Sequence, residues 1–252
     1  MGEKSFRLNL RTQRLGVDEN GRAQWEVTLT ERLVPADRTA LILCDVWDRH
    51  WSRGASERVD ALAPCLNEAA RAARLAGAAV IHAPSETLDF YAQSPARKRA
   101  QTLERVQPPR SRRHASPRLP VDDSDGGSDT GEKPWYPAWT RQHPAIEIDE
   151  ALDIISDDGL EIYSFLRARG IAQVLIAGVH TNMCILNRSF GIKQMVCWGV
   201  PVALVRDLTH AMYNPAMPPY VSHAEGTRLV IEYIEKFWCP TVLSSDLLQA
   251  DD

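Results

Sequence analysis

Apolar residues follow two different spacings along the chain, and the two spacings predict different elements. Unbroken apolar runs at 39–45, 78–82 and 172–178 are typical of strands that are covered on both faces. Between the first two runs, segment 57–76 carries apolar residues on one helical face and ends before Gly77. This spacing predicts an amphipathic helix between two buried strands.

Strand and helix patterns alternate again after Pro144. This alternation predicts a three-layer α/β/α Rossmann-like fold with a mainly parallel central sheet. In this part of the chain we expect a short strand at 145–149, a helix at 156–169 capped by Ser156 and stopped by Gly170, a strand at 172–178, a helix at 182–198 ended by Gly199, a strand at 200–206, a helix at 225–237 and a last strand at 241–243.

Two segments stand outside this alternation, although we expect one domain over residues 1–252. Residues 5–30 alternate polar and apolar around Asn20-Gly21, which predicts a β-hairpin in an accessory N-terminal arm, 1–35. Residues 92–145 are rich in Pro, Ser, Arg and Asp, with seven basic residues over 97–113 and an acidic stretch over 122–132. We expect an irregular, solvated insertion whose two halves partly neutralise each other; a lid or an oligomer arm is the alternative.

Composition narrows the class of protein. Of the 252 residues, 44% are apolar and 25% are charged, and the net charge of −4 argues against a general nucleic-acid binder. The sequence has neither an apolar run of bilayer length nor an apolar signal core. Its five cysteines form no Cys-x-x-Cys pair, which favours a reducing compartment. We therefore expect a cytoplasmic protein without membrane or nucleic-acid partners.

Two reactive side chains follow buried strands. Asp45 ends the first strand, and Cys184 comes shortly after the strand that ends at Gly178. The carboxyl ends of parallel strands meet at one edge of a sheet, where ligands bind. A cysteine in the first turn of a helix is expected to have a lowered pKa, as a nucleophile requires. The alternatives are a buried structural cysteine and an aspartate that only caps a turn.

The same pair lies in motifs of a known superfamily. The segments TALILCDVWD at 39–48 and ARGIAQVLIAGVHTNMC at 168–184, with residues 200–207, resemble the isochorismatase-like cysteine hydrolases. This superfamily includes nicotinamidases, N-carbamoylsarcosine amidases, ureidoacrylate amidases and isochorismatases. The resemblance covers residues 36–95 and 145–245, and leaves out the hairpin and most of the insertion.

The resemblance implies roles for individual residues. Cys184 matches the family's nucleophile, Asp45 matches its catalytic aspartate, and Val179–His180 matches a peptide bond that is cis in the family. The main-chain amides of His180 and Cys184 would then form an oxyanion hole. The implied activity is hydrolysis of a small amide-like (C–N) substrate through a Cys184 thioester. Two alternatives stay open: isochorismatase-type vinyl-ether hydrolysis that uses Asp45 without covalent catalysis, and a non-catalytic binding or scaffold protein.

One departure from the family concerns its catalytic lysine, which usually follows a strand in the middle of the chain. The strand expected at 145–149 is followed by Glu150 and Ala151 instead. Lys133 or Arg141, both upstream in the insertion, are our candidates for a replacement cation.

The remaining candidates concern the substrate pocket and a metal. Nicotinamidases of this group hold zinc through an Asp and two His, whereas His50, His82 and Asp89 here lack that spacing. We therefore expect no metal and no other cofactor. The partner should be a small-molecule substrate, and the hairpin arm together with the family's habits suggests a homo-oligomer. The residues expected to line the pocket are Trp47, His50, Trp51, Ser85, Tyr91 and His210.

Overall fold

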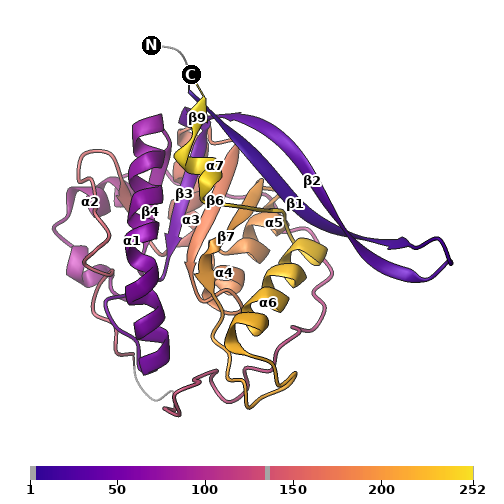
Figure 1. Ribbon diagram of the computed structural model, residues 1–252. Coiled ribbons are helices and arrows are strands. Elements are labelled where there is room, and N and C mark those ends of the chain that lie inside the picture. Colours follow the sequence, from indigo (N-terminus) through magenta and orange to yellow (C-terminus); the bar gives the residue numbers. More distant parts are fainter. Residues whose placement is uncertain (1–3, 134–136, 252) are drawn as a thin grey trace.

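Nine strands of the computed structural model, which describes residues 4–133 and 137–251, form one sheet in the order β2-β1-β8-β7-β6-β3-β4-β5, with β9 paired to β1 (Figure 1). The five strands from β8 to β4 and the short β5 are mutually parallel, whereas β1 pairs antiparallel with β2, β8 and β9. The strands are β1 Ser5–Val17, β2 Ala23–Pro35, β3 Thr39–Cys44, β4 Ala79–Ala83, β5 Ile154–Ile155, β6 Gln173–Val179, β7 Val202–His210, β8 Thr241–Val242 and β9 Ala250–Asp251.

Helices cover both faces of the sheet because alternate strand residues point to opposite sides. Leu41 and Leu43 of β3 pack in one apolar cluster with α1 and the base of the hairpin. Ile42 and Cys44 pack in the other cluster with α3, α5 and α6. The three-layer fold is therefore confirmed. The helices are α1 Arg53–Ala76, α2 Pro95–Gln101, α3 Gly159–Ala168, α4 Cys184–Asn187, α5 Ile192–Trp198, α6 His223–Phe237 and α7 Ser245–Leu248, with short 3-10 helices η1 Ala36–Arg38 and η2 Leu88–Tyr91.

The N-terminal hairpin is confirmed and is longer than predicted. β1 and β2 pair without interruption from Ser5↔Pro35 to Val17↔Ala23. At the turn, the Asp18 carboxylate accepts hydrogen bonds from the main-chain N–H groups of Asn20 and Arg22. Figure 1 shows the far half of the hairpin extending away from the rest of the molecule.

The strand expected at 145–149 is wrong. Side chains, rather than a neighbouring strand, satisfy the main-chain donors of this segment: Asn67 accepts from Glu147 N, and Asp153 accepts from Asp149 N. The strand beside β4 is instead the two-residue β5, which pairs at Ile81↔Ile154. Segment 145–149 therefore folds as a loop despite its alternating apolar residues, because side chains accept its main-chain hydrogen bonds.

The helix predicted at 156–169 begins three residues later than expected. It starts at Gly159 with Asp158 as its N-cap, because the predicted cap Ser156 donates its hydroxyl to Glu161 instead. Gly170 follows it in the left-handed region, with φ 62°.

The predicted helix 182–198 is two helices, α4 and α5. Arg188 leaves the helical region, with ψ 156°, and the chain turns back at Gly191. A Cβ at Gly191 would lie 2.9 Å from the Ile185 carbonyl oxygen. Only glycine fits this close approach. The predicted helix is therefore interrupted between Asn187 and Ile192.

The described ion pairs of the insertion join it to the body of the protein. Arg97 is buried against Glu161 of α3, and Arg105 pairs with the same carboxylate. In the acidic half, Asp129 makes a two-pronged ion pair with Arg58 of α1. The expectation that the two halves neutralise each other is therefore wrong where ion pairs are described. No helix within the described ranges has both the length and the apolarity needed to cross a bilayer.

Candidate active site

Asp45 lies at the carboxyl end of β3 and is fully buried. Its main-chain N–H bonds to the Ala83 carbonyl of the neighbouring strand β4 at 2.9 Å. The side chain accepts two further hydrogen bonds, at 2.8 Å from Ser85 N to Oδ1 and at 2.8 Å from Arg188 Nε to Oδ2. The carboxylate is therefore fixed in orientation from two sides.

Cys184 is the first residue of α4, and its thiol lies close enough to the Asp45 carboxylate for each group to shift the pKa of the other. The His180 main-chain N–H points at the Cys184 sulfur, and the Val179–His180 peptide bond is cis as predicted. The sulfur, the carboxylate and a main-chain donor thus meet at the carboxyl edge of β3 and β6. Cys184 opens onto a surface pocket of about 540 Å³, lined also by Leu119, Asp123, Asn182, Met183, Asn187, Arg188 and Lys193.

The charges at this edge act on both reactive groups. Burial raises the pKa of the Cys184 thiol, and the neighbouring Asp45 charge raises it further, while Arg188 opposes both. The expectation of a lowered cysteine pKa is therefore wrong, because α4 is only four residues long and its dipole is outweighed. Burial also raises the pKa of Asp45, against the opposing effects of Arg188, Cys184 and Ser85. The resting site holds a protonated thiol beside a carboxylate that is a stronger base than an exposed aspartate.

Arg188, which was not predicted from the sequence, supplies the cation at this site. Its Nε bonds to Asp45, and its Nη1 forms an ion pair with Glu86 at 3.1 Å. The guanidinium also lies over the Trp47 ring, 5.9 Å from its centre. The available signal was the spacing, since Arg188 lies four residues after Cys184 and residues four apart share a helix face.

The two cations proposed from the sequence lie elsewhere. Lys133 is exposed, and the Arg141 guanidinium lies over the Phe90 ring at 5.4 Å. Among the described ion pairs, Asp45 is joined to Arg188 rather than to either of them. Ser156, which follows β5 where a lysine would be expected, is buried and bonded to Glu161.

Aromatic side chains form a wall beside Arg188. Trp47 stacks on Trp139 of the insertion with 4.2 Å between ring centres, and its indole N–H donates to the Ser85 carbonyl at 3.0 Å. Trp139 donates to the Glu86 carboxylate, which also holds Arg188. The insertion therefore reaches the site through Trp139, a contact that composition alone does not reveal.

Four histidine rings run in a row from the aromatic wall to the start of α6, and the two middle rings are buried. Ring centres are 5.1 Å apart for His50 and His180, 5.2 Å for His180 and His210, and 6.0 Å for His210 and His223. Burial lowers the pKa of His50 to about 4 and that of His210 to about 3, and it lowers the pKa of His180 as well. The Nε2 atoms of His180 and His210 are buried without a hydrogen-bond partner. These rings are neutral near pH 7.

None of the six residues predicted to line the substrate pocket is among the described residues that line the Cys184 pocket. Trp51 lies 4.9 Å from His50, between ring centres, on the side of the aromatic wall. Tyr91 is held in a separate apolar cluster, where its hydroxyl accepts from Gln142 N. His82 uses both ring nitrogens, on Asp153 and Gln142. Across the described residues, no group of three or more His, Cys, Asp or Glu has an arrangement that could hold a metal ion.

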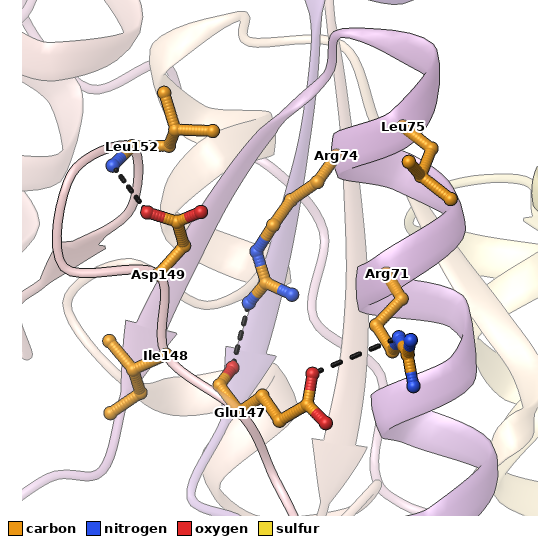
Figure 2. A pocket seen from close by; sticks show the side chains of 7 residues that line it. All are labelled: Arg71, Arg74, Leu75, Glu147, Ile148, Asp149 and Leu152. Carbon is orange, nitrogen blue, oxygen red and sulfur yellow. Dashed lines mark hydrogen bonds and ion pairs between the residues drawn. The ribbon is translucent and has the colours of Figure 1, made fainter.

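A second pocket of about 520 Å³ lies between the C-terminal part of α1 and loop 147–152 (Figure 2). Its polar side chains already have partners within the pocket. Arg74 donates to the Glu147 main-chain carbonyl, Arg71 pairs with the Glu147 carboxylate, and the Asp149 carboxylate accepts from Leu152 N. Because α1 returns from the carboxyl edge of the sheet, this pocket is near the amino ends of the strands. It shares no lining residue with the Cys184 pocket.

Comparisons with known proteins agree with this geometry. A family model described as "Isochorismatase domain" matches residues 39–216, whereas a search of curated proteins gives no match. A cysteine hydrolase from Pseudomonas syringae pv. phaseolicola 1448A is 18% identical, with 85% of this chain and 92% of that chain covered and a TM-score of 0.53. An isochorismatase from Pseudomonas putida KT2440 is 12% identical, with 84% and 91% covered and a TM-score of 0.50. At these identities the two structures show a shared fold.

Proposed function

Because the chain belongs to the isochorismatase family and is thus an isochorismatase-family hydrolase, we propose that it is a cysteine hydrolase of small amide-like substrates. The observation that carries this proposal is the proximity of the Cys184 thiol to the buried Asp45 carboxylate, where each group shifts the pKa of the other. A nucleophile beside its own base is the minimal apparatus for covalent acyl transfer. The pocket of about 540 Å³ at Cys184 is of the size that holds a small molecule.

In the first half-reaction, the Cys184 sulfur attacks the substrate carbonyl carbon while its proton passes to Asp45. The developing oxyanion is held by main-chain N–H groups, for which His180 N, aimed at the sulfur, and Cys184 N are the donors. The tetrahedral intermediate then breaks its C–N bond. Asp45 returns the proton to the leaving nitrogen, which departs as ammonia or an amine and leaves a thioester.

In the second half-reaction, water attacks the thioester carbonyl and gives a proton to Asp45. The C–S bond breaks, the acid product leaves, and the proton returns to the Cys184 sulfur. Asp45 therefore acts as base, acid, base and acid in turn, which requires a pKa between that of an exposed carboxyl and neutrality. Burial, partly offset by Arg188, raises the pKa of Asp45, which favours this role.

Arg188 is proposed to hold Asp45 in place rather than to carry protons. A guanidinium stays charged at all working pH values, so it suits a fixed clamp better than a proton shuttle. Its second ion pair, to Glu86, anchors the clamp on the loop after β4. In this proposal the clamp replaces the lysine that the family resemblance leads one to expect.

The test is a panel of small amides and ureides assayed for ammonia or amine release, with Cys184→Ala, Cys184→Ser and Asp45→Asn variants. We expect kcat/KM to fall at least about 10⁴-fold in the alanine and asparagine variants. Mass spectrometry of the wild-type enzyme quenched during turnover should show an acyl adduct on Cys184. Full activity of Cys184→Ala on every substrate found would rule out the covalent route.

The same variants separate the two alternatives. Vinyl-ether hydrolysis without covalent catalysis predicts retained activity in Cys184→Ser and loss in Asp45→Asn. A scaffold protein predicts no turnover by the wild type on any member of the panel. The clamped carboxylate favours catalysis over the scaffold, because burying an ionised group has a high energetic cost that apolar packing would avoid.

A further inference from the structure

The outermost strand of the sheet, β2, presents an open edge along its whole length. β2 pairs with β1 in one unbroken register, and it is the end strand of the sheet order. At the hairpin turn Asp18 N bonds to Arg22 O, and at the base Ala36 N bonds to Lys4 O. Even-numbered residues of β2 therefore direct their main-chain groups at β1. Odd-numbered residues from Trp25 to Leu33 direct theirs outward.

The side chains of these outward-bonding residues are mostly apolar and exposed. Val27, Leu29 and Leu33 are 53%, 66% and 56% exposed. Proteins usually protect such an edge with proline, lysine, a bulge or a short strand. β2 has thirteen residues, its register with β1 has no bulge, and its proline, Pro35, lies at its last position.

We propose that β2 pairs antiparallel with β2 of a second copy of this chain, about a two-fold axis at Leu29. The sheets of the two copies then continue into each other. An antiparallel contact between identical strands is isologous, so each contact occurs twice and the assembly closes as a dimer. This proposal is independent of the proposed activity.

Charge complementarity selects this register. With Leu29 opposite its own copy, Glu26 lies opposite Arg32 of the partner subunit, twice, and both side chains are exposed. Thr28 faces Thr30 of the partner subunit, and Trp25 faces Leu33 of the partner subunit. Val27 faces Glu31 of the partner subunit, which is the unmatched pair of this register. Opposite charges, threonine pairs and aromatic–aliphatic pairs are the favourable cross-strand combinations.

Neighbouring registers that keep the hydrogen bonds lose these matches. Shifting the axis to Thr28 places Trp25 opposite Glu31 and Glu26 opposite Thr30. Shifting it to Thr30 places Glu26 opposite Val34 and Leu29 opposite Glu31. The main-chain N–H and C=O groups of successive β2 residues point alternately towards β1 and towards the open edge. A two-fold axis between two residues would therefore place a residue that bonds to β1 opposite one that bonds outward, and the hydrogen bonds between the copies would be lost. The register centred on Leu29 is therefore favoured.

The first experiment measures the self-association of the full chain by sedimentation equilibrium, for the wild type, Glu26→Arg and the double variant Glu26→Arg/Arg32→Glu. We expect a wild-type dimer. The single variant places like charges opposite each other twice and should raise the dissociation constant at least about tenfold. The double variant restores opposite charges and should restore the dimer. A monomeric wild type, or a dimer unaffected by the single variant, would overturn the proposal.

The second experiment fixes the axis by cross-linking in a Cys65→Ser background, because Cys65 is exposed. Leu29→Cys should form an intermolecular disulfide under mild oxidation, since Cα atoms of directly opposed residues are about 5.5 Å apart. Val17→Cys is the matched control: Val17 is 69% exposed but lies on β1, off the edge. Cross-linking of both variants at equal rates would contradict the proposed axis. The absence of a cross-link in Leu29→Cys would contradict it as well.

Discussion

Arg188 Nε donates to Asp45 Oδ2 at 2.8 Å, across 143 positions of sequence. The bond joins the end of β3 to the turn between α4 and α5. Because Arg188 opposes the effect of burial on the Asp45 carboxyl, it sets how readily that carboxyl takes a proton. The pair therefore controls the base on which the proposed chemistry depends.

Removal of this guanidinium should shift the pH dependence of activity. In Arg188→Met, Asp45 loses its opposing positive charge, so its pKa rises further. Since Asp45 must be ionised to accept the thiol proton, activity is present above its pKa and is lost as the pH falls through it. The acid limb of kcat/KM should therefore move to higher pH.

Arg188→Lys is the matched control for that experiment. It keeps the charge but loses the two-point geometry, so its acid limb should stay close to the wild-type position while kcat falls. An unchanged acid limb in Arg188→Met would show that Asp45 is not the titrating base.

Thiol labelling should follow exposure rather than catalytic role. Cys65 is exposed, whereas burial and the Asp45 charge raise the pKa of Cys184. Since the thiolate is the reactive form, iodoacetamide near pH 7 should modify Cys65 first. The lowered pKa expected for a cysteine at a helix N-terminus would give the opposite order. Peptide mapping by mass spectrometry gives the order directly.

A raised cysteine pKa does not argue against catalysis here. Asp45 can take the proton during attack, so a preformed thiolate is not required. Cys184 labelled faster than Cys65 would show instead that the sulfur is already ionised at rest.

The histidine row should make stability depend on pH below neutrality. Because burial lowers the pKa values of His180 and His210, the unfolded chain binds protons below about pH 6.5 while the folded chain does not. Stability is therefore complete above the unfolded pKa and falls as the pH decreases. Two such residues contribute a loss of about 2–4 kcal/mol between pH 6.5 and 5.

Urea unfolding at several pH values measures this loss. His210→Gln should reduce the slope of stability against pH in that interval, because one titrating group is removed. Carboxylates with lowered pKa values, such as Asp153 and Glu161, act below this interval and do not obscure it. An equal slope in wild type and variant would show that His210 takes up its proton while folded.

The insertion should be fastened mainly by Arg97. Arg97 is 9% exposed and bonded to Glu161 and to the Ile155 carbonyl. In Arg97→Met the buried Glu161 loses its nearest charge, which should cost about 3 kcal/mol. Arg105→Met is the control, because the Arg105 side chain is 35% exposed and a pair at the surface contributes under about 1 kcal/mol. Chemical unfolding compares the two, and equal losses would contradict a special role for Arg97.

The sequence was sufficient to predict the strands in which every residue is buried. β3, β4 and β6 are covered on both faces, so their apolar runs mark them without help from distant residues. The sequence was insufficient where side chains from distant parts of the chain determine the local backbone structure. Asn67 and Asp153 take the donors of the segment predicted as a strand at 145–149, and neither lies within it.

The candidate site was predicted in part for the same reason. Asp45 and Cys184 could be placed together because both follow parallel strands. Arg188 was not predicted, although its spacing from Cys184 was a signal. Its orientation also depends on the break after α4 and on the close packing at Gly191, which the local pattern does not reveal. Cytoplasmic location and the absence of nucleic-acid partners stay predictions from composition.

The spacing of Cys184 and Arg188 on one turn of chain has a consequence for how such sites can be recognised. The proposed nucleophile and the proposed clamp lie on one five-residue peptide, so any shift of that peptide displaces both relative to Asp45. In a related chain without the family lysine, an arginine at the fourth position after the cysteine would therefore predict the same arrangement.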